Sequence, residues 1–411
     1  MTSRPETALI LTSLALLLAV PVLAQEKLLQ LPIGDPARKD RESPLVLDAV
    51  TDTKTGDLIT PDEMVKRLAG VRLLLVGEEH TAMEAHRVQA RVIEALVAAR
   101  RRVRIGLEMY PYTEQRFLDQ WGDNRLTERG FLRLSRWYEN WGYNWLYYRD
   151  IFLFARDRRI PMFAVNTPRE VVSAIRKKGL ANLTPEEAAH IPKEIDVDNA
   201  DHMTFFRASF EDAEGPVHGS GMPEEMWKNM LSAQATWDAT MGYNSVQSLR
   251  KDASPDSIMV VLVGSGHVAY GLGIERQARK WFDGPFATLI PVPVTNRKTG
   301  PVKSVRASYA DFVWGVPEEI DSLYPTLGIS MAVGQGEASR RVIMVQKDSV
   351  AEQAGFRVGD TLVSMDDVPL ADKETYNRFL AGKRWGDTAA FVVRRGDETV
   401  TLKAVFRRKL E

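Results

Sequence analysis

The sequence contains no cysteine among its 411 residues. This absence excludes disulfide bonds, thiolate metal ligands, a cysteine nucleophile, covalent haem attachment through cysteine and lipid attachment to an N-terminal cysteine. Any metal or acid–base chemistry must therefore use the carboxylates and the six histidines. The histidines are His80, His86, His190, His202, His218 and His267.

An excess of charge of one sign is also absent, because the formal net charge is −1. Nothing in this balance favours nucleic acid or an anionic membrane surface as a partner. The chain is 44% hydrophobic and 27% charged, which is typical of a globular protein with a substantial core. Its length predicts two domains, or one large domain with an appendage.

Long apolar runs are missing except near the N-terminus. Residues 8–22 form an almost unbroken apolar run after Arg4, and the small residue Ala24 ends the segment. This pattern predicts a signal peptide, residues 1–24, cleaved after Ala24. An uncleaved anchor helix is the alternative, but the run is short for a span of about 20 residues. We therefore expect an exported, periplasmic protein that is not a lipoprotein.

Two stretches far apart in the sequence share one pattern, an apolar strand followed by Gly-x-x-His. Residues 72–76 lead into Gly77-Glu78-Glu79-His80, and residues 258–263 lead into Gly264-Ser265-Gly266-His267. A helical pattern follows the first stretch, with apolar residues recurring from Met83 to Val97. Each histidine is thus predicted to lie in a turn just beyond the end of a buried strand.

Polar residues follow other predicted strands in the same way. Glu108 follows a strand at 103–107, and Asn166 follows one at 160–165. Asp238 lies on a predicted helix, residues 224–241, before the second Gly-x-x-His stretch. The carboxyl ends of parallel strands meet at one edge of a sheet, where ligands bind in open α/β folds. We therefore predict an α/β fold, with a largely parallel sheet flanked by helices, whose polar edge is a functional site.

Aromatic residues are concentrated between residues 131 and 154. This segment is either a helical pair that packs in the core or the wall of a pocket for a flat apolar ligand. Residues 182–223 show no clear periodicity and predict a long functional loop or lid with a short helix in it. His202 and His218 are expected in the loop.

The last part of the chain, residues 324–408, predicts a small β-rich domain and resembles a PDZ domain. The resemblance is carried by residues 349–356, 359–362 and 327–329. PDZ domains bind an extended peptide by strand addition and hold its terminal carboxylate on backbone N–H groups. The resemblance implies that Leu327, Gly328 and Ile329 hold the carboxylate, and that the peptide lies between residues 329–332 and a helix at 375–380.

Residues 45–315 resemble the ChaN-like haem-binding uptake family, within the wider Tiki and erythromycin-esterase superfamily. Five motifs carry this resemblance: Gly77-Glu78-Glu79-His80 with His86, Leu107-Glu108-Met109, residues 164–169, residues 233–238, and Gly264-Ser265-Gly266-His267. The superfamily contains haem binders and hydrolases, so the resemblance implies both possibilities.

The leading hypothesis is haem or iron binding, in iron or haem acquisition. A haem site needs an apolar slot and one or two axial donors. The candidate donors and cofactor-binding residues are Tyr148, Tyr110, His202, His218, His86 and Asn166. No spacing selects among them.

The alternative hypothesis is a metal-dependent peptidase or esterase. Here His80, His267 and Glu78 would bind a divalent ion that acidifies water. The candidate catalytic residues are Glu78, His80, Glu108, Asp238 and His267. A metal-free variant would use one of the two histidines as general base. A third possibility is a scaffold whose PDZ domain recruits a partner. A homodimer is possible in each case.

Overall fold

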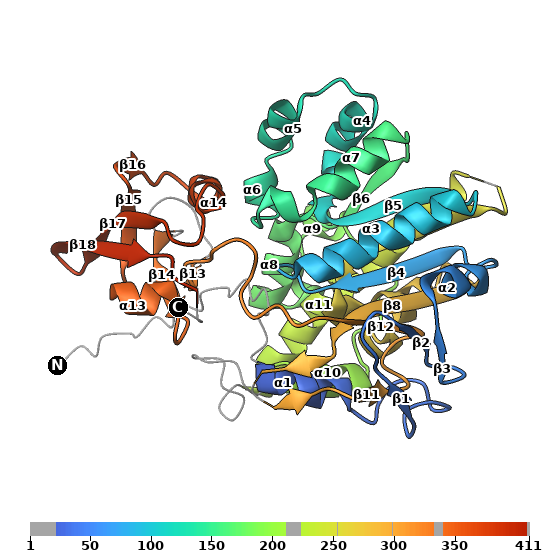
Figure 1. Ribbon diagram of the computed structural model, residues 1–411. Helices are drawn as coiled ribbons and strands as arrows, with labels where there is room; N and C mark the ends of the chain where they lie inside the picture. Colours follow the sequence, from blue (N-terminus) through green and yellow to red (C-terminus); the bar gives the residue numbers. More distant parts are fainter. Residues whose placement is uncertain (1–21, 211–222, 253, 298, 333–339, 409–411) are drawn as a thin grey trace, which may run out of the picture.

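The computed structural model describes residues 22–210, 223–252, 254–297, 299–332 and 340–408. The chain folds into a large α/β unit and a smaller β-rich unit that lies beside it (Figure 1). Within the described residues, no helix has the length and apolarity needed to cross a membrane. The helix α1, Val22–Leu29, runs across the predicted cleavage point, and the rest of the predicted signal peptide lies outside the described residues.

The large unit is built on an eight-stranded sheet in the order β3-β2-β12-β8-β4-β7-β5-β6. The six strands from β12 to β6 are parallel, and β2 and β3 are antiparallel at one edge. The strands are β2 (Val50–Asp52), β3 (Asp57–Ile59), β4 (Leu73–Glu78), β5 (Arg102–Pro111), β6 (Met162–Asn166), β7 (Ser257–Gly264), β8 (Phe286–Pro293) and β12 (Phe312–Val316). The predicted α/β class with a largely parallel sheet is confirmed.

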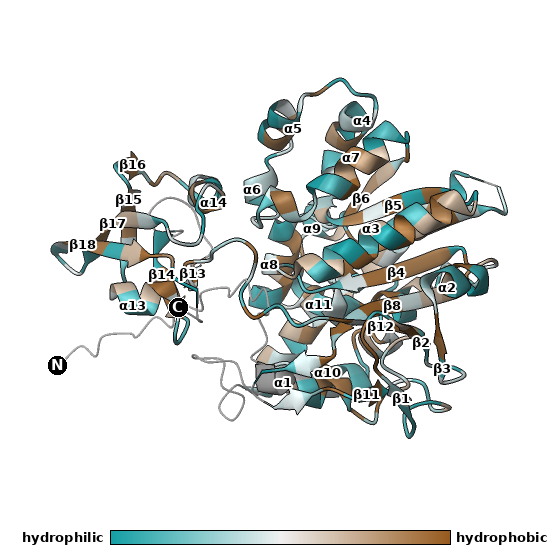
Figure 2. Cartoon of the chain, viewed as in Figure 1, coloured by the Kyte–Doolittle hydropathy of each residue, from teal (hydrophilic) through white to brown (hydrophobic). Residues whose placement is uncertain are grey.

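Alternate residues of the central strands pack into two separate cores, one on each face of the sheet. In β4, Leu74 and Val76 join one core while Leu73 and Leu75 join the other. This follows from the two-residue period of a strand, which points successive side chains to opposite faces. Because both faces are covered, β4 is apolar from Leu73 to Val76, and most of this strand is brown in Figure 2.

Helices cover both faces of the sheet (Figure 1). The first face carries α3 (Met83–Ala98), α4 (Gln115–Gly122), α5 (Glu128–Leu134), α6 (Trp137–Asn140) and α7 (Arg149–Asp157). The second face carries α1, α10 (Ala200–Ala208), α11 (Glu224–Arg250), α12 (Ile274–Ala278) and, packed on α11, α8 (Arg169–Lys178). The helix α2, Pro61–Arg67, has Thr60 as its N-cap and Pro61 in its first turn.

Two expectations need correction. The strand β5 does not stop before Glu108 but continues to Pro111, and its pairing with β6 shifts register between Leu107 and Pro111. Glu108 therefore lies at this irregularity rather than after the strand. His202 lies on α10 and not in a loop, because Asn199 caps that helix by accepting from the His202 backbone N–H. His218 lies outside the described residues.

The smaller unit has its own core around Leu327, Tyr376 and Phe391. A two-stranded sheet pairs β13 (Ile329–Met331) with β14 (Val342–Val345). A four-stranded sheet contains β16 (Val368–Pro369), β15 (Thr361–Met365), β17 (Thr388–Arg395) and β18 (Glu398–Val405). The helices are α13 (Val350–Ala354) and α14 (Lys373–Ala381).

Candidate functional site

The first Gly-x-x-His turn places Glu78 and His80 together at the end of β4. His80 Nδ1 lies 2.8 Å from Glu78 Oε1, and Tyr148 donates its phenolic O–H to that oxygen at 2.6 Å. Gln89 of α3 donates to the other oxygen of Glu78 at 2.7 Å. Burial opposes ionisation of Glu78, but His86, His80 and Tyr148 outweigh it and lower its pKa to about 2. Glu78 is thus ionised, has hydrogen-bond partners on both carboxylate oxygens, and orients His80.

The second turn builds a similar pair from the end of β7. His267 Nδ1 lies 2.5 Å from Asp238 Oδ1 of α11. Burial would lower the pKa of His267, but Asp238 and Glu108 raise it to about 10. His267 is therefore an imidazolium at neutral pH, held between two carboxylates.

Glu108 lies between the two histidines. Its Oε1 is 3.4 Å from His267 Nε2, and its Oε2 accepts from the Gly264 backbone N–H at 2.7 Å. The ring of His80 lies against Gly264, since a Cβ there would stand 3.0 Å from His80 Cε1. Burial raises the pKa of Glu108, but His267 and His80 lower it overall. Glu108 is thus a buried carboxylate facing both imidazoles.

The structure therefore brings all five predicted catalytic residues to one edge of the sheet, in the order Asp238, His267, Glu108, His80 and Glu78. Each histidine has a carboxylate at Nδ1, which fixes the ring and leaves Nε2 for other contacts. This alternation of acids and imidazoles can hold or move protons across the ends of β4, β5 and β7. Their chemical roles remain predictions.

Aromatic rings cover His80, whose side chain is 16% exposed. The His80 ring centroid lies 4.8 Å from that of Trp141 and 4.9 Å from that of Tyr143. Most of the aromatic segment, including Trp137 and Phe152, is instead fully buried in the core. The core role is thus confirmed for most of the segment, and its middle part reaches His80. The wall of a pocket for a flat ligand stays a prediction.

The two tyrosines proposed as haem ligands are buried and hydrogen-bonded. Tyr148 donates to Glu78, and the Tyr110 hydroxyl lies 2.8 Å from that of Ser135. Burial raises the pKa of both phenols, and the Glu78 carboxylate raises that of Tyr148 as well. Iron could reach either oxygen only after these hydrogen bonds opened and the surrounding core moved.

The other predicted cofactor-binding residues that the structure describes are buried around the site. His86 lies on α3, with Nε2 3.2 Å from the His80 carbonyl oxygen, and Asn166 donates to the Glu108 carbonyl at 2.7 Å. His202 is 1% exposed, and burial lowers its pKa to about 4. Its Nδ1 lies 3.2 Å from Arg276 Nη2.

Sequence reasoning missed Gln89 and Arg276. Gln89 follows His86 by three positions on the same helix, so helical spacing placed it on the side that faces Glu78. No local pattern pointed to Arg276, because α12 meets α10 only through the tertiary fold.

A metal site is not assembled here. Within the described residues, no three His, Asp or Glu side chains are arranged to hold a metal ion. Of the predicted metal ligands, Glu78 already accepts hydrogen bonds from Tyr148 and Gln89, and both nitrogens of His267 carry a proton at neutral pH. A metal ligand must instead be deprotonated.

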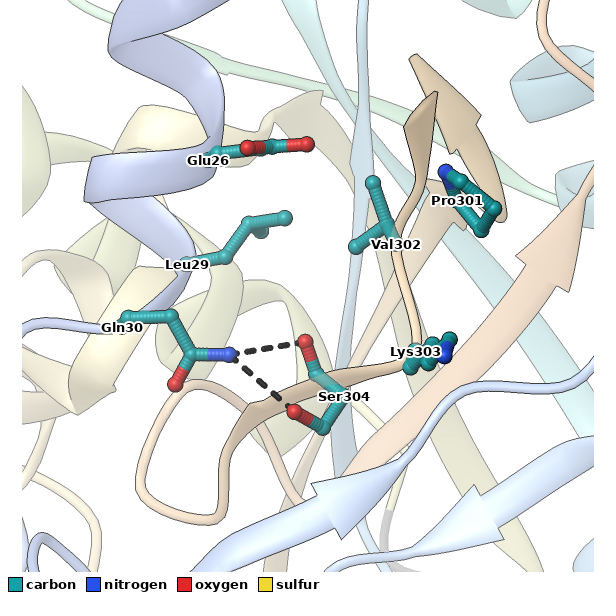
Figure 3. Close-up of a pocket in the computed structure, with 7 residues that line it drawn as sticks. All are labelled: Glu26, Leu29, Gln30, Pro301, Val302, Lys303 and Ser304. Atoms are coloured by element: carbon teal, nitrogen blue, oxygen red, sulfur yellow. Dashed lines mark hydrogen bonds between the residues drawn. The ribbon is translucent and has the colours of Figure 1, made fainter. Parts of the chain in front are cut away.

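Two cavities in the described structure lie away from this site. One, of about 160 Å³, lies between α1 and residues 301–304, where Gln30 donates to the Ser304 carbonyl at 2.8 Å (Figure 3). The other, of about 190 Å³, lies between α13 and β18 in the smaller unit.

The predicted peptide-binding residues lead into β13. Gly328 has φ +82°, and a Cβ there would stand 2.3 Å from Ser349 Cβ, so only glycine fits. Leu327 points into the core of the smaller unit, while its carbonyl accepts from Ala351 N–H at 2.8 Å. The loop can therefore offer a ligand its backbone and Ile329, at the start of β13.

The fold and site define a protein class: an α/β domain with a polar, histidine-containing sheet edge, followed by a small β-rich domain. Comparison with known families is more specific. Residues 64–277 match the family described as haem-binding uptake, Tiki superfamily, ChaN, and residues 325–405 match the PDZ domain. The chain belongs to this ChaN-like haem-binding family and carries a C-terminal PDZ domain.

Individual relatives are distant. The chain is 25% identical over 218 residues to Protein RETICULATA-RELATED 5, chloroplastic, of Arabidopsis thaliana, covering 52% of this chain and only 29% of that protein. A solved structure titled "Cofacial heme binding to ChaN of Campylobacter jejuni" is 18% identical, with a TM-score of 0.49, covering 64% of this chain and 95% of that one. An erythromycin esterase mutant in its open conformation is 13% identical, with a TM-score of 0.38, covering 66% and 97%.

Proposed function

We propose that this protein binds haem at the edge of the large sheet and serves haem or iron acquisition outside the cytoplasm. Its PDZ domain would recruit the carboxyl terminus of a peptide partner. Family membership supports the haem assignment. Export rests on the predicted signal peptide, and a homodimer stays a prediction.

The observation that carries the proposal is the environment of His80. Its Nδ1 is held by Glu78, so Nε2 is the nitrogen that can face a ligand. Trp141 and Tyr143 place aromatic surface beside the same ring, as a flat apolar ligand requires. His80 therefore fits an axial ligand better than Tyr148 or Tyr110 does.

A cation for a haem propionate is available at the same rim. Arg169 begins α8 and donates to the carbonyl of Asn140, the residue before Trp141. When bound, haem iron would supply ligand-exchange or redox chemistry. The protein's own residues would hold the ring, orient His80 and keep Glu78 ionised.

A haemin titration of the full chain tests this proposal. We expect a saturable, sharpened Soret band that His80→Ala weakens at least ten-fold in affinity, because the donor nitrogen is lost. His190→Ala is the matched control, since the contacts of His190 are with Tyr112 and not with His80. No saturable band would overturn haem binding, and an unchanged band in His80→Ala would overturn the assignment of His80.

Hydrolysis is the second candidate, and the alternating acids and imidazoles favour it. Glu108 is ionised and could accept a proton from water, while the imidazolium of His267 could stabilise developing negative charge or donate a proton. Assays with activated esters and unstructured peptides, with and without added zinc, test this candidate. We expect Glu108→Gln to abolish any turnover, and Glu94→Gln, at an exposed position of α3, to leave it unchanged.

A further inference from the structure

The PDZ domain touches the large domain through one wall of its expected peptide groove. The helix α14 packs against α6, and the two lie side by side in Figure 1. Asn377 of α14 donates to the Tyr138 carbonyl at 2.7 Å, and Asn144 donates to the Ala381 carbonyl at 3.2 Å. Each domain thus contributes one side-chain amide that binds the backbone of the other.

The segment held in this way is the one that covers His80. We call residues 137–145 the lid, because Trp141 and Tyr143 within it pack against the His80 ring. Gly142 stands between these two residues, and a Cβ there would lie 2.8 Å from Asn377 Nδ2. Asn377 therefore rests directly on the part of the lid that carries both rings.

The backbone of the lid has two points suited to act as hinges. Arg136 precedes α6 with φ 51°, and Gly142 follows α6 with φ +93°. Left-handed backbone is unfavourable for a residue with a side chain and persists only where the surroundings enforce it. The contacts with α14 are part of those surroundings.

Charges across the contact have mixed signs, since Arg136 beside α6 also lowers the pKa of Asp372, which caps α14. Lys373 opens α14, and burial together with Arg169 of α8 lowers its pKa to about 7, while Glu139 of α6 acts in the opposite direction. Two basic groups thus approach each other across the two domains. The two amide hydrogen bonds are the directional contacts that tie α14 to the segment around α6.

The strand on the other side of the groove is available to a peptide. β13 pairs with β14, and among the described residues no strand pairs with its other edge. A peptide added there would lie between β13 and α14 and would contact the helix that holds the lid. Binding energy can change a distant site only through such a differential contact.

We propose that α14 of the PDZ domain holds the lid closed over His80, and that a peptide carboxyl terminus entering the groove beside α14 releases it. The occupant is a peptide with a free terminal carboxylate. By linkage, a ligand that needs the open lid would in turn strengthen peptide binding. The consequence for haem rests on the proposed function, whereas movement of the lid does not.

Chemical labelling of His80 in the full, haem-free chain tests the proposal. Diethyl pyrocarbonate modifies accessible imidazole nitrogens, and mass spectrometry reports the rate at each histidine. We expect Asn377→Ala to raise the rate at His80 about five-fold, the change expected in a closed-to-open ratio when one ordinary hydrogen bond is lost. Asn377→Arg should raise it further, because the space beside Gly142 has no room for a longer side chain.

Gln353→Ala is the matched control, since it truncates an exposed amide on α13 of the same domain. His190 serves as the internal reference in every sample. Equal rates at His80 in the Asn377 and Gln353 variants would overturn the role of α14.

The peptide is tested with a ten-residue probe ending in Val-Val with a free carboxylate, and with its C-terminal amide. The free acid should accelerate labelling of wild-type His80 and have little effect on the already open Asn377→Arg. No acceleration, or equal acceleration by the amide, would overturn release by a peptide terminus. If labelling responds as expected while haemin does not bind, the proposed release of the lid is supported and the proposed haem binding is overturned.

Discussion

The two Gly-x-x-His turns share a motif but not an environment. His80 is partly exposed beside Trp141 and Tyr143, whereas His267 is buried between Asp238 and Glu108. Each ring is fixed by a carboxylate at Nδ1. Carboxylates raise the pKa of both imidazoles against the effect of burial. The motif therefore sets the position of the ring, and the neighbouring side chains decide how far it is exposed to a ligand.

The largest expected effect comes from removing the carboxylate of the buried pair. Asp238→Asn would leave the His267 imidazolium without its main counter-charge, and we expect a loss of about 3 kcal/mol in the free energy of unfolding. Urea denaturation measures this loss. Asp57→Asn, in an exposed pair with Arg67, should change little. Equal free energies of unfolding for the two variants would show that the Asp238–His267 pair does not stabilise the fold.

The equivalent substitution in the first Gly-x-x-His turn should lower the affinity for haemin. Glu78→Gln removes the charge that orients His80, and we expect haemin affinity to fall by about 10- to 100-fold, as for other carboxylates that hold a ligating histidine in place. Tyr148→Phe removes only one hydrogen bond to Glu78 and should cost less. A larger loss in Tyr148→Phe would favour the phenol as the iron ligand, and titration of both variants decides between them.

Stability at alkaline pH should report the charge on His267 in the second turn. The pKa of His267 is about 10 in the folded protein, above its ordinary value of 6.5, so its contribution is fully present below pH 6.5. Stability should fall as the pH rises from 6.5 toward 10, when the folded state loses this proton. Urea denaturation of the wild type at several pH values measures the slope. Asp238→Asn should flatten the slope, and a slope unchanged in that variant would contradict the assignment.

The smallest effect concerns the glycines of the second turn. Gly264→Ala places a Cβ 3.0 Å from His80 Cε1, so the ring must shift, and we expect a loss of about 1 kcal/mol with a modest drop in haemin affinity. Gly266→Ala meets nothing within 4 Å and is the matched control. Thermal denaturation and titration of both variants should differ only for Gly264→Ala.

Much of this site could be read from the sequence, because parallel strands bring their carboxyl ends to one edge. The apolar runs before Gly77 and Gly264 marked the strands, and the polar residues after them marked the site. The sequence placed Glu108 at that edge even though β5 continues past it. The shift in register between β5 and β6 lies within the strand and leaves no break in the apolar pattern, so the sequence did not reveal it.

The roles of individual tyrosines and the docking of the PDZ domain could not be read in the same way. Tyr148 meets Glu78, and Asn377 meets Tyr138, across long separations in the chain. Such contacts depend on how helices pack, and neither periodicity nor local spacing specifies them. His202 was placed in a loop because the polar run before α10 hid the cap at Asn199.

The position of β7 in the sheet has a consequence for how the molecule folds. This strand follows β4, β5 and β6 in the chain, yet it lies between β4 and β5. The first half of the chain therefore cannot close the central sheet by itself, and a gap remains until the strand before His267 has been synthesised and inserted. Non-local pairing of this kind is slow. The insertion of one late strand would then complete the sheet and assemble the site in the same step.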